Sequence, residues 1–146
     1  MGLDPNGRGY VNGLYIGPNV DLEGANLEDA DLSNADLRGA FLIGACLKDA
    51  NLSNAKLRGA VLSSADLSGA DLKDADLQAT NLFRANLMSA DLRGAKIAGA
   101  DFLCASVAYA KITHSQLVII REAKERELKA TLVYDDRAGN PSRYYR

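Results

Sequence analysis

The feature that most constrains this chain is a five-residue repeat that runs from Asp21 to Ser115. A small residue, almost always Ala, recurs at positions 25, 30, 35 and onward to 110, and a large apolar residue recurs at 22, 27, 32 and onward to 112. A period of five fits neither the 3.6-residue period of a helix nor the sustained alternation of a long strand. The repeat therefore sets the architecture before any other feature is considered.

One unit, Ala35-Asp36-Leu37-Arg38-Gly39, indicates how each repeat folds. Ala35 and Leu37 should face an interior while Asp36 faces water, as in a short pleated strand. Arg38 and Gly39 then form a polar corner, a position that Gly, Asn, Asp and Ser favour. Right-angle corners give four sides and a coil of twenty residues, with successive coils about 4.8 Å apart.

Units such as Ala30-Asp31-Leu32-Ser33-Asn34 and Ala90-Asp91-Leu92-Arg93-Gly94 resemble the A(D/N)LXX signature of the pentapeptide repeat family. The resemblance covers nineteen consecutive units centred from Leu22 to Ile112, with Thr80 among the few residues that replace an inward Ala. It implies an all-β solenoid, a right-handed quadrilateral β-helix of about five coils over residues 21–115. Fold alone assigns no function.

Residues 1–20 fit the repeat poorly and hold five glycines, two prolines and an apolar cluster from Tyr10 to Ile16. Because the first coil of a solenoid exposes apolar core and unpaired strand edges, this segment is expected to be an N-terminal cap. A ligand-binding loop is the alternative. Gly7-Arg8-Gly9 does not resemble a phosphate-binding loop, since it follows no strand and lacks the Lys-Ser/Thr sequel.

Residues 116–130 are predicted to form a helix that caps the last coil. Thr113 and Gln116 have capping-box spacing, and Glu122 with Arg126 and Glu125 with Lys129 are favourable i,i+4 pairs. The expected apolar stripe contains Leu117, Ile120 and Leu128 with Ala123 nearby. Residues 131–146 form a tail, with a turn-rich loop expected from Asp135 to Ser142.

The chain has 146 residues and a formal net charge of −2, which fits one domain and gives no sign of a generally basic nucleic-acid binder. It lacks both a run of eighteen apolar residues and the start of a signal peptide. A cytoplasmic location is expected, or the periplasm or a lumen if a signal has been removed. Cys46 and Cys104 should lie almost three coils apart, about 14 Å in height, too far for a disulfide.

The repeat supplies many carboxylates but little chemistry. His114 is the only histidine, so neither a His-based metal cluster nor a Ser-His-Asp triad is available. Carboxylates on a solvated convex surface lack the pocket that general-acid catalysis needs. We therefore expect no enzyme activity, no cofactor and no metal.

A clustering of apolar residues at outward positions is less ordinary. Five of the six outward apolar residues before the final coil map to one side of the polygon, and Met88 is the exception. Such a patch usually marks an interface, although the N-terminal cap or the tail residues Leu132 to Tyr134 and Tyr144-Tyr145 could cover it. The candidate partner-binding residues are Phe41, Ile43, Val61, Phe83 and Leu103.

The sequence thus favours a non-enzymatic structural or protein-interaction module whose partner is an unidentified protein, with a homodimer through the C-terminal helix as a further arrangement. Direct binding to nucleic acid or membrane is not expected. The family resemblance suggests an alternative, a dimeric DNA-mimicking inhibitor of DNA gyrase. Against it, residues 21–115 hold thirteen acidic and nine basic residues, and four of the basic ones share one side: Arg38, Lys56, Arg58 and Lys96.

Overall fold

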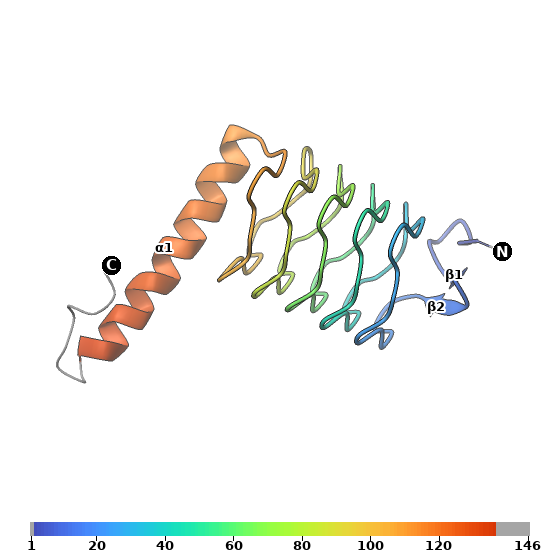
Figure 1. Ribbon diagram of the computed structural model, residues 1–146, viewed down its shortest axis with the longest axis horizontal. Helices are drawn as coiled ribbons and strands as arrows, with labels where there is room; N and C mark the ends of the chain where they lie inside the picture. Colours follow the sequence, from blue (N-terminus) through green and yellow to red (C-terminus); the bar gives the residue numbers. More distant parts are fainter. Residues whose placement is uncertain (1, 137–146) are drawn as a thin grey trace.

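A computed structural model describes the backbone of residues 2–136 and the side chains of residues 2–126. It contains two short strands near the N-terminus, β1 (Gly9–Val11) and β2 (Leu14–Ile16), and one helix, α1 (His114–Asp136). Between them the chain winds as a stack of similar coils, with the β1–β2 hairpin at one end and α1 across the other (Figure 1).

Residues twenty apart pair with each other throughout the stack. Parallel bridges run from Asp21 with Phe41 to Asp91 with Lys111, always at the outward residue that precedes the large apolar one. This register confirms the twenty-residue coil that the repeat predicts. Successive bridges also link Asp31, Asn51, Asp71 and Asp91 into one outward column.

Hydrogen bonds explain the signature of the repeat. In the unit around Leu32, backbone N–H groups of Leu32 and Asn34 donate to the next coil, at 2.8 and 2.9 Å, and the N–H of Ala35 closes a turn on the C=O of Leu32 at 3.0 Å. The N–H of Ser33 instead donates to Oδ1 of Asp31 at 3.1 Å. An outward Asp or Asn therefore satisfies the one N–H that neighbouring coils leave free.

Every unit turns its corner through a left-handed residue. The last residue of each unit from Gly24 to Tyr109 has a φ between 54° and 77°. This conformation favours Gly, Asn and Asp, which explains why these residues recur there. Ala79, Arg84, Cys104 and Tyr109 adopt it without that advantage.

The interior is a continuous column of Leu and Ala side chains. Almost all inward residues from Leu22 to Ala105 are buried, and Leu and Ala at the centre of the stack are fully inaccessible. Thr80 fits the Ala position because its buried Oγ1 donates to the C=O of Leu57 at 2.8 Å. Neither cysteine is in a disulfide, as predicted.

The N-terminal segment packs on the first coil. β1 and β2 pair as an antiparallel hairpin, and Leu3, Val11 and Leu14 contact the buried core, in which Ile16 is inaccessible. The C=O of Gly7 accepts the N–H of Asp36 at 2.7 Å, in the place that a preceding coil would occupy.

At the other end, α1 packs on the last coil through side chains that replace backbone donors. Gln116 is buried, and its Nε2 donates to the C=O groups of Leu92 and Ala95 at 2.6 and 3.0 Å. Nζ of Lys124 donates to the C=O of Ala105 at 2.8 Å. Within the stack, the C=O of each inward Ala accepts the backbone N–H of the residue twenty-one positions later, as the C=O of Ala75 accepts that of Lys96. The side chains of Gln116 and Lys124 supply the corresponding donors at the last coil.

The capping box at the start of α1 is confirmed, because Thr113 N donates to Oε1 of Gln116 at 2.8 Å and Gln116 N donates to Oγ1 of Thr113 at 3.3 Å. α1 begins at His114, two residues before the predicted start at residue 116, because the residue that follows the N-cap Thr113 is already helical. It also continues to Asp136, so Asp135 and Asp136 do not start a loop. In the sequence, the first Gly or Pro after the N-cap Thr113 is Gly139, so no helix-breaking residue lies within α1.

The predicted contact stripe on α1 was partly wrong. Ile120 is buried as expected, but Leu117 is 39% exposed and Gln116 takes the buried position. Nε of Arg126 donates to the C=O of Glu122 at 3.3 Å rather than to its carboxylate. The structure does not describe the side chains of Leu128, Lys129 or Leu132 to Tyr134, and it does not describe Tyr144-Tyr145 or the predicted loop beyond Asp136.

Candidate protein-interaction face

The five candidate residues occupy two adjacent columns on one side of the stack. Phe41 bridges Val61, and their column continues to Asn81 and Asp101. In the second column, two residues further along each unit, Ser64 N donates to the C=O of Phe83 and Arg84 N to the C=O of Leu103. We call the surface of Phe41, Ile43, Val61, Phe83 and Leu103 the apolar face.

The apolar face is accessible from outside the stack. Phe41 is 47% exposed, and the other four residues are half-buried. The guanidinium carbon of Arg84 lies 5.8 Å from the centre of the Phe83 ring, within cation–π range. A cation therefore borders the apolar face, whose two rings are partly exposed among the residues that the structure describes.

Phe41 and Val61 occupy positions where the repeat ordinarily gains a hydrogen bond. In their own column, Asp21, Asn81 and Asp101 accept the N–H two residues on, at 3.1, 2.9 and 2.8 Å. Phe41 and Val61 have no side-chain acceptor to offer. The N–H two residues after each of them therefore lacks the side-chain acceptor that the other three residues of the column supply.

Other exposed apolar residues lie outside the apolar face, among them the tyrosines Tyr10, Tyr15 and Tyr109. Met88 is 42% exposed on the neighbouring side, away from the apolar face. On α1, Leu117, Val118 and Ile119 are each about two-fifths exposed, at 39, 41 and 38%. These three consecutive helix residues project in different directions around α1, and all three lie apart from the apolar face.

The side that carries Arg38 holds a buried carboxylate. Asp36 is 1% exposed and accepts from Nε and Nη2 of Arg38, at 2.7 and 2.8 Å, and from Nη2 of Arg8, at 3.1 Å. The Arg38 guanidinium, with a contribution from Arg8, holds the pKa of Asp36 far below its ordinary value of 3.8 and outweighs the opposing effect of burial. This ion triad ties the N-terminal segment to the first coil.

Replacing Asp36 by Asn should cost about 1–2 kcal/mol at pH 7, a modest amount because both arginines are half exposed. Since the pKa of Asp36 is lower in the folded protein, the ionised carboxylate stabilises the fold above about pH 4, and that stability is lost as the pH falls through the folded value. Chemical denaturation of both proteins from pH 7 to pH 2 should show their stability difference narrowing. A constant difference would contradict the assignment.

On the next side, cations pair with two carboxylates of the column Asp31, Asn51, Asp71 and Asp91. Nζ of Lys73 lies 3.0 Å from Asp71, and Nη2 of Arg93 lies 2.7 Å from Asp91. The Arg93 contact lowers the pKa of Asp91 to about 2. Within the part of the chain whose side chains are described, no three His, Cys, Asp or Glu residues gather as metal ligands would.

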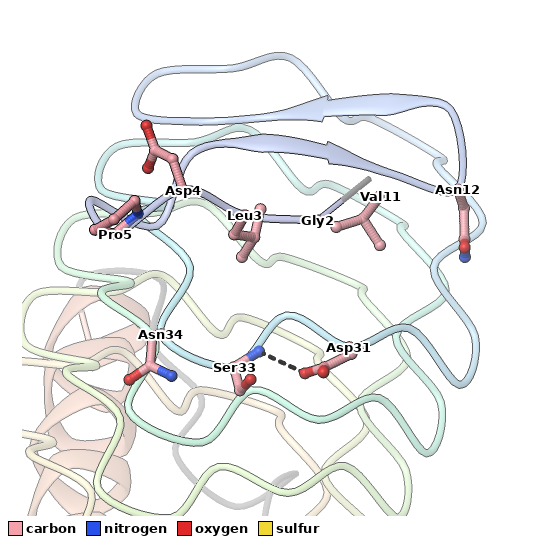
Figure 2. A pocket seen from close by; sticks show the side chains of 9 residues that line it. All are labelled: Gly2, Leu3, Asp4, Pro5, Val11, Asn12, Asp31, Ser33 and Asn34. Atoms are coloured by element: carbon pink, nitrogen blue, oxygen red, sulfur yellow. Dashed lines mark hydrogen bonds between the residues drawn. The ribbon is translucent and has the colours of Figure 1, made fainter.

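A depression of about 680 Å³ separates the N-terminal segment from the first coil. In Figure 2 the Gly2 to Asp4 stretch runs on one side of it and the Asp31 to Asn34 stretch on the other. We call it the N-terminal slot; its walls are Gly2 to Pro5, Val11 and Asn12, and opposite them Asp31, Ser33 and Asn34. The repeat pattern does not predict this slot, because the outer wall of the slot lies outside the repeat.

Comparisons with known proteins agree with the geometry. A family model for pentapeptide repeats matches residues 19–54, 45–82 and 85–118, in eight copies. A search among curated proteins finds no match. Within the described residues, no helix combines the length and the apolar character needed to cross a membrane.

Many solved structures resemble this one, and three of them show the range of relatives. A pentapeptide repeat protein from the Arabidopsis thaliana thylakoid lumen is 33% identical, with a TM-score of 0.70 over 71% of this chain and 72% of that one. HetL, a pentapeptide repeat protein involved in heterocyst differentiation regulation in the cyanobacterium Nostoc, is 41% identical, with a TM-score of 0.58 over 64% and 43%. QnrB1, a plasmid-mediated fluoroquinolone resistance protein, is 29% identical, with a TM-score of 0.52 over 55% and 45%.

Proposed function

This chain belongs to the pentapeptide repeat family, whose members form right-handed quadrilateral β-helices, and on that premise we propose that it is a non-enzymatic module that binds a protein partner through the apolar face. The observation that carries the proposal is the pair Phe41 and Val61, which replace hydrogen-bonding residues in their column and leave Phe41 about half exposed. Aromatic residues that are partly exposed in such a cluster commonly anchor interfaces.

We further propose that the segments outside the array, residues 1–20 and α1, act as caps on a β-helix of about five coils. Support comes from the hydrogen bonds by which Gly7, Gln116 and Lys124 occupy the places of missing coils. Caps leave the outward columns free for recognition, since they cover the ends of the stack rather than its sides.

The proposal predicts that Phe41→Asp/Phe83→Asp abolishes capture of a specific protein from a lysate of the source cells. Each carboxylate would lie at the centre of the apolar face, where it would be desolvated on binding. Thermal melting of the variant should stay within a few degrees of wild type, because both side chains point outward. Met88→Asp is the matched control and should capture as wild type does, since Met88 is equally exposed on another side.

The opposite pattern would remove the proposal. If the double variant melts far below wild type and wild type captures nothing specific, the apolar face serves internal packing. If Met88→Asp loses the same protein, binding does not depend on the apolar face in particular.

A dimeric, DNA-mimicking inhibitor of DNA gyrase is the second candidate. Two observations favour it: the likeness to QnrB1, and the partly exposed apolar side chains of Leu117, Val118 and Ile119 on α1, some of which a dimer through the helix would bury. The basic residues that share the side of Arg38 weigh against mimicry of a polyanion. A supercoiling assay without inhibition at micromolar protein, together with a monomer in sedimentation, would eliminate this candidate.

A further inference from the structure

The backbone of the first coil is only partly paired on its N-terminal edge. In the second coil, the N–H of Asn51 donates to the C=O of Ala30 at 2.9 Å, and the C=O groups of Asn51 and Ser53 accept from Leu32 and Asn34 at 2.8 and 2.9 Å. In the first coil, the corresponding groups are the N–H and C=O of Asp31 and the C=O of Ser33. Among the described residues, none of these three bonds another backbone group.

The N-terminal segment completes this edge on the adjacent side but not here. There, the C=O of Gly7 accepts from Asp36 at 2.7 Å and the N–H of Asn19 donates to the C=O of Arg38 at 2.9 Å. At Asp31 the segment instead stands off across the N-terminal slot. One donor and two acceptors, spaced as on a strand edge, therefore face a cavity.

The opposite wall of the slot is apolar in the middle. Figure 2 shows the side chains of Leu3 and Val11 directed toward the Asp31 to Asn34 stretch. Asp4 and Asp31 are the charged residues of the lining, and both are acidic. A strand edge, an apolar wall and negative charge together define the chemistry of an occupant.

We propose that the N-terminal slot binds an extended peptide segment that carries a basic side chain, by adding a strand to the first coil at Asp31 and Ser33. The C=O of the peptide accepts the N–H of Asp31, and two of its N–H groups donate to the C=O groups of Asp31 and Ser33. Its apolar side chain packs against Leu3 and Val11. This site is independent of the apolar face, so either can fail without the other.

The test uses a blocked peptide made of two copies of the sequence Ala55 to Gly59, which already forms a side of a coil and carries Lys and Arg at outward positions. Titration into the whole protein should give a dissociation constant on the order of 0.1 mM. Amide shifts in NMR spectra should concentrate at Leu3, Val11, Asp31, Ser33 and Asn34. The same peptide with N-methylated leucines, which removes the donor to the C=O of Asp31, should bind at least tenfold more weakly.

Two variants test the charge. Asp31→Asn keeps the Oδ1 acceptor for the N–H of Ser33 but removes the carboxylate, and should weaken binding about threefold. Asp71→Asn makes the same change two coils away, keeps its bond to the N–H of Lys73, and should bind the peptide as wild type does.

Phe41→Asp/Phe83→Asp should also bind this peptide unchanged. Equal binding of the methylated peptide would overturn strand addition, and equal binding to Asp31→Asn would overturn recognition of the basic side chain. Shifts that fall outside the slot, or no binding at millimolar peptide, would overturn the proposal as a whole.

Discussion

Replacing Gly7 by Ala should lower the free energy of unfolding by about 3 kcal/mol, and the melting temperature by roughly 6–12 °C. Gly7 has a φ of +82°, where an L side chain is strained, and a Cβ there would overlap the C=O oxygen of Asn34 and lie 2.7 Å from the N of Asp36. Both neighbours are backbone atoms of the first coil, so neither can move without disturbing the hydrogen bond between Gly7 and Asp36. Thermal and chemical denaturation measure the loss.

Gly13→Ala is the matched control. Gly13 has a similar φ of +78° in the same segment, but a Cβ there meets nothing within 4 Å. Its cost should be the conformational penalty alone, about 1 kcal/mol. If the strain in Gly7→Ala unravels only the N-terminal segment, hydrogen exchange at the amide of Asp36 will speed up before the melt changes. Equal behaviour of both variants in both measurements would show that Gly7 does not pack against the coil as described.

Sequence periodicity was sufficient to predict the columns of the solenoid. Because each unit has the same length, Asp31, Asn51, Asp71 and Asp91 had to align once the coil held twenty residues, and the bridges confirm it. The separation of Cys46 from Cys104 and the adjacency of Phe41 and Val61 follow from the same arithmetic. Such predictions succeed because every coil repeats the geometry of the last.

The ends of the stack could not be predicted in the same way. The hairpin of β1 and β2, the fit of Gly7 and the N-terminal slot depend on tertiary contacts with a coil far along the chain. An apolar stripe predicted Leu117 as a contact of α1, but the free carbonyls of the last coil favour a donor there. Gln116 was foreseen as a capping residue, whereas its buried bonds to the coil were not.

Gln116→Ala should therefore destabilise the protein by about 2–4 kcal/mol, beyond the effect of losing a helix cap, which is about 1 kcal/mol. The substitution removes the bond from Thr113 N to Oε1 and leaves the buried C=O of Ala95 without the donor that Nε2 supplies. Leu92 keeps its turn bond from Ala95 N at 3.0 Å, so the loss falls mainly on Ala95. Denaturant unfolding followed by circular dichroism measures the change.

Gln116→Glu separates the two roles of this side chain. Glu retains the acceptor for Thr113 N but cannot donate to the C=O groups of Leu92 and Ala95, and it buries a negative charge beside them. It should cost at least as much as Gln116→Ala, whereas a residue needed only for the capping box would tolerate Glu well. Gln78→Ala, at a partly exposed position in the array, should change stability by less than about 0.5 kcal/mol. A stable Gln116→Glu variant would mean that the last coil does not depend on donors from α1.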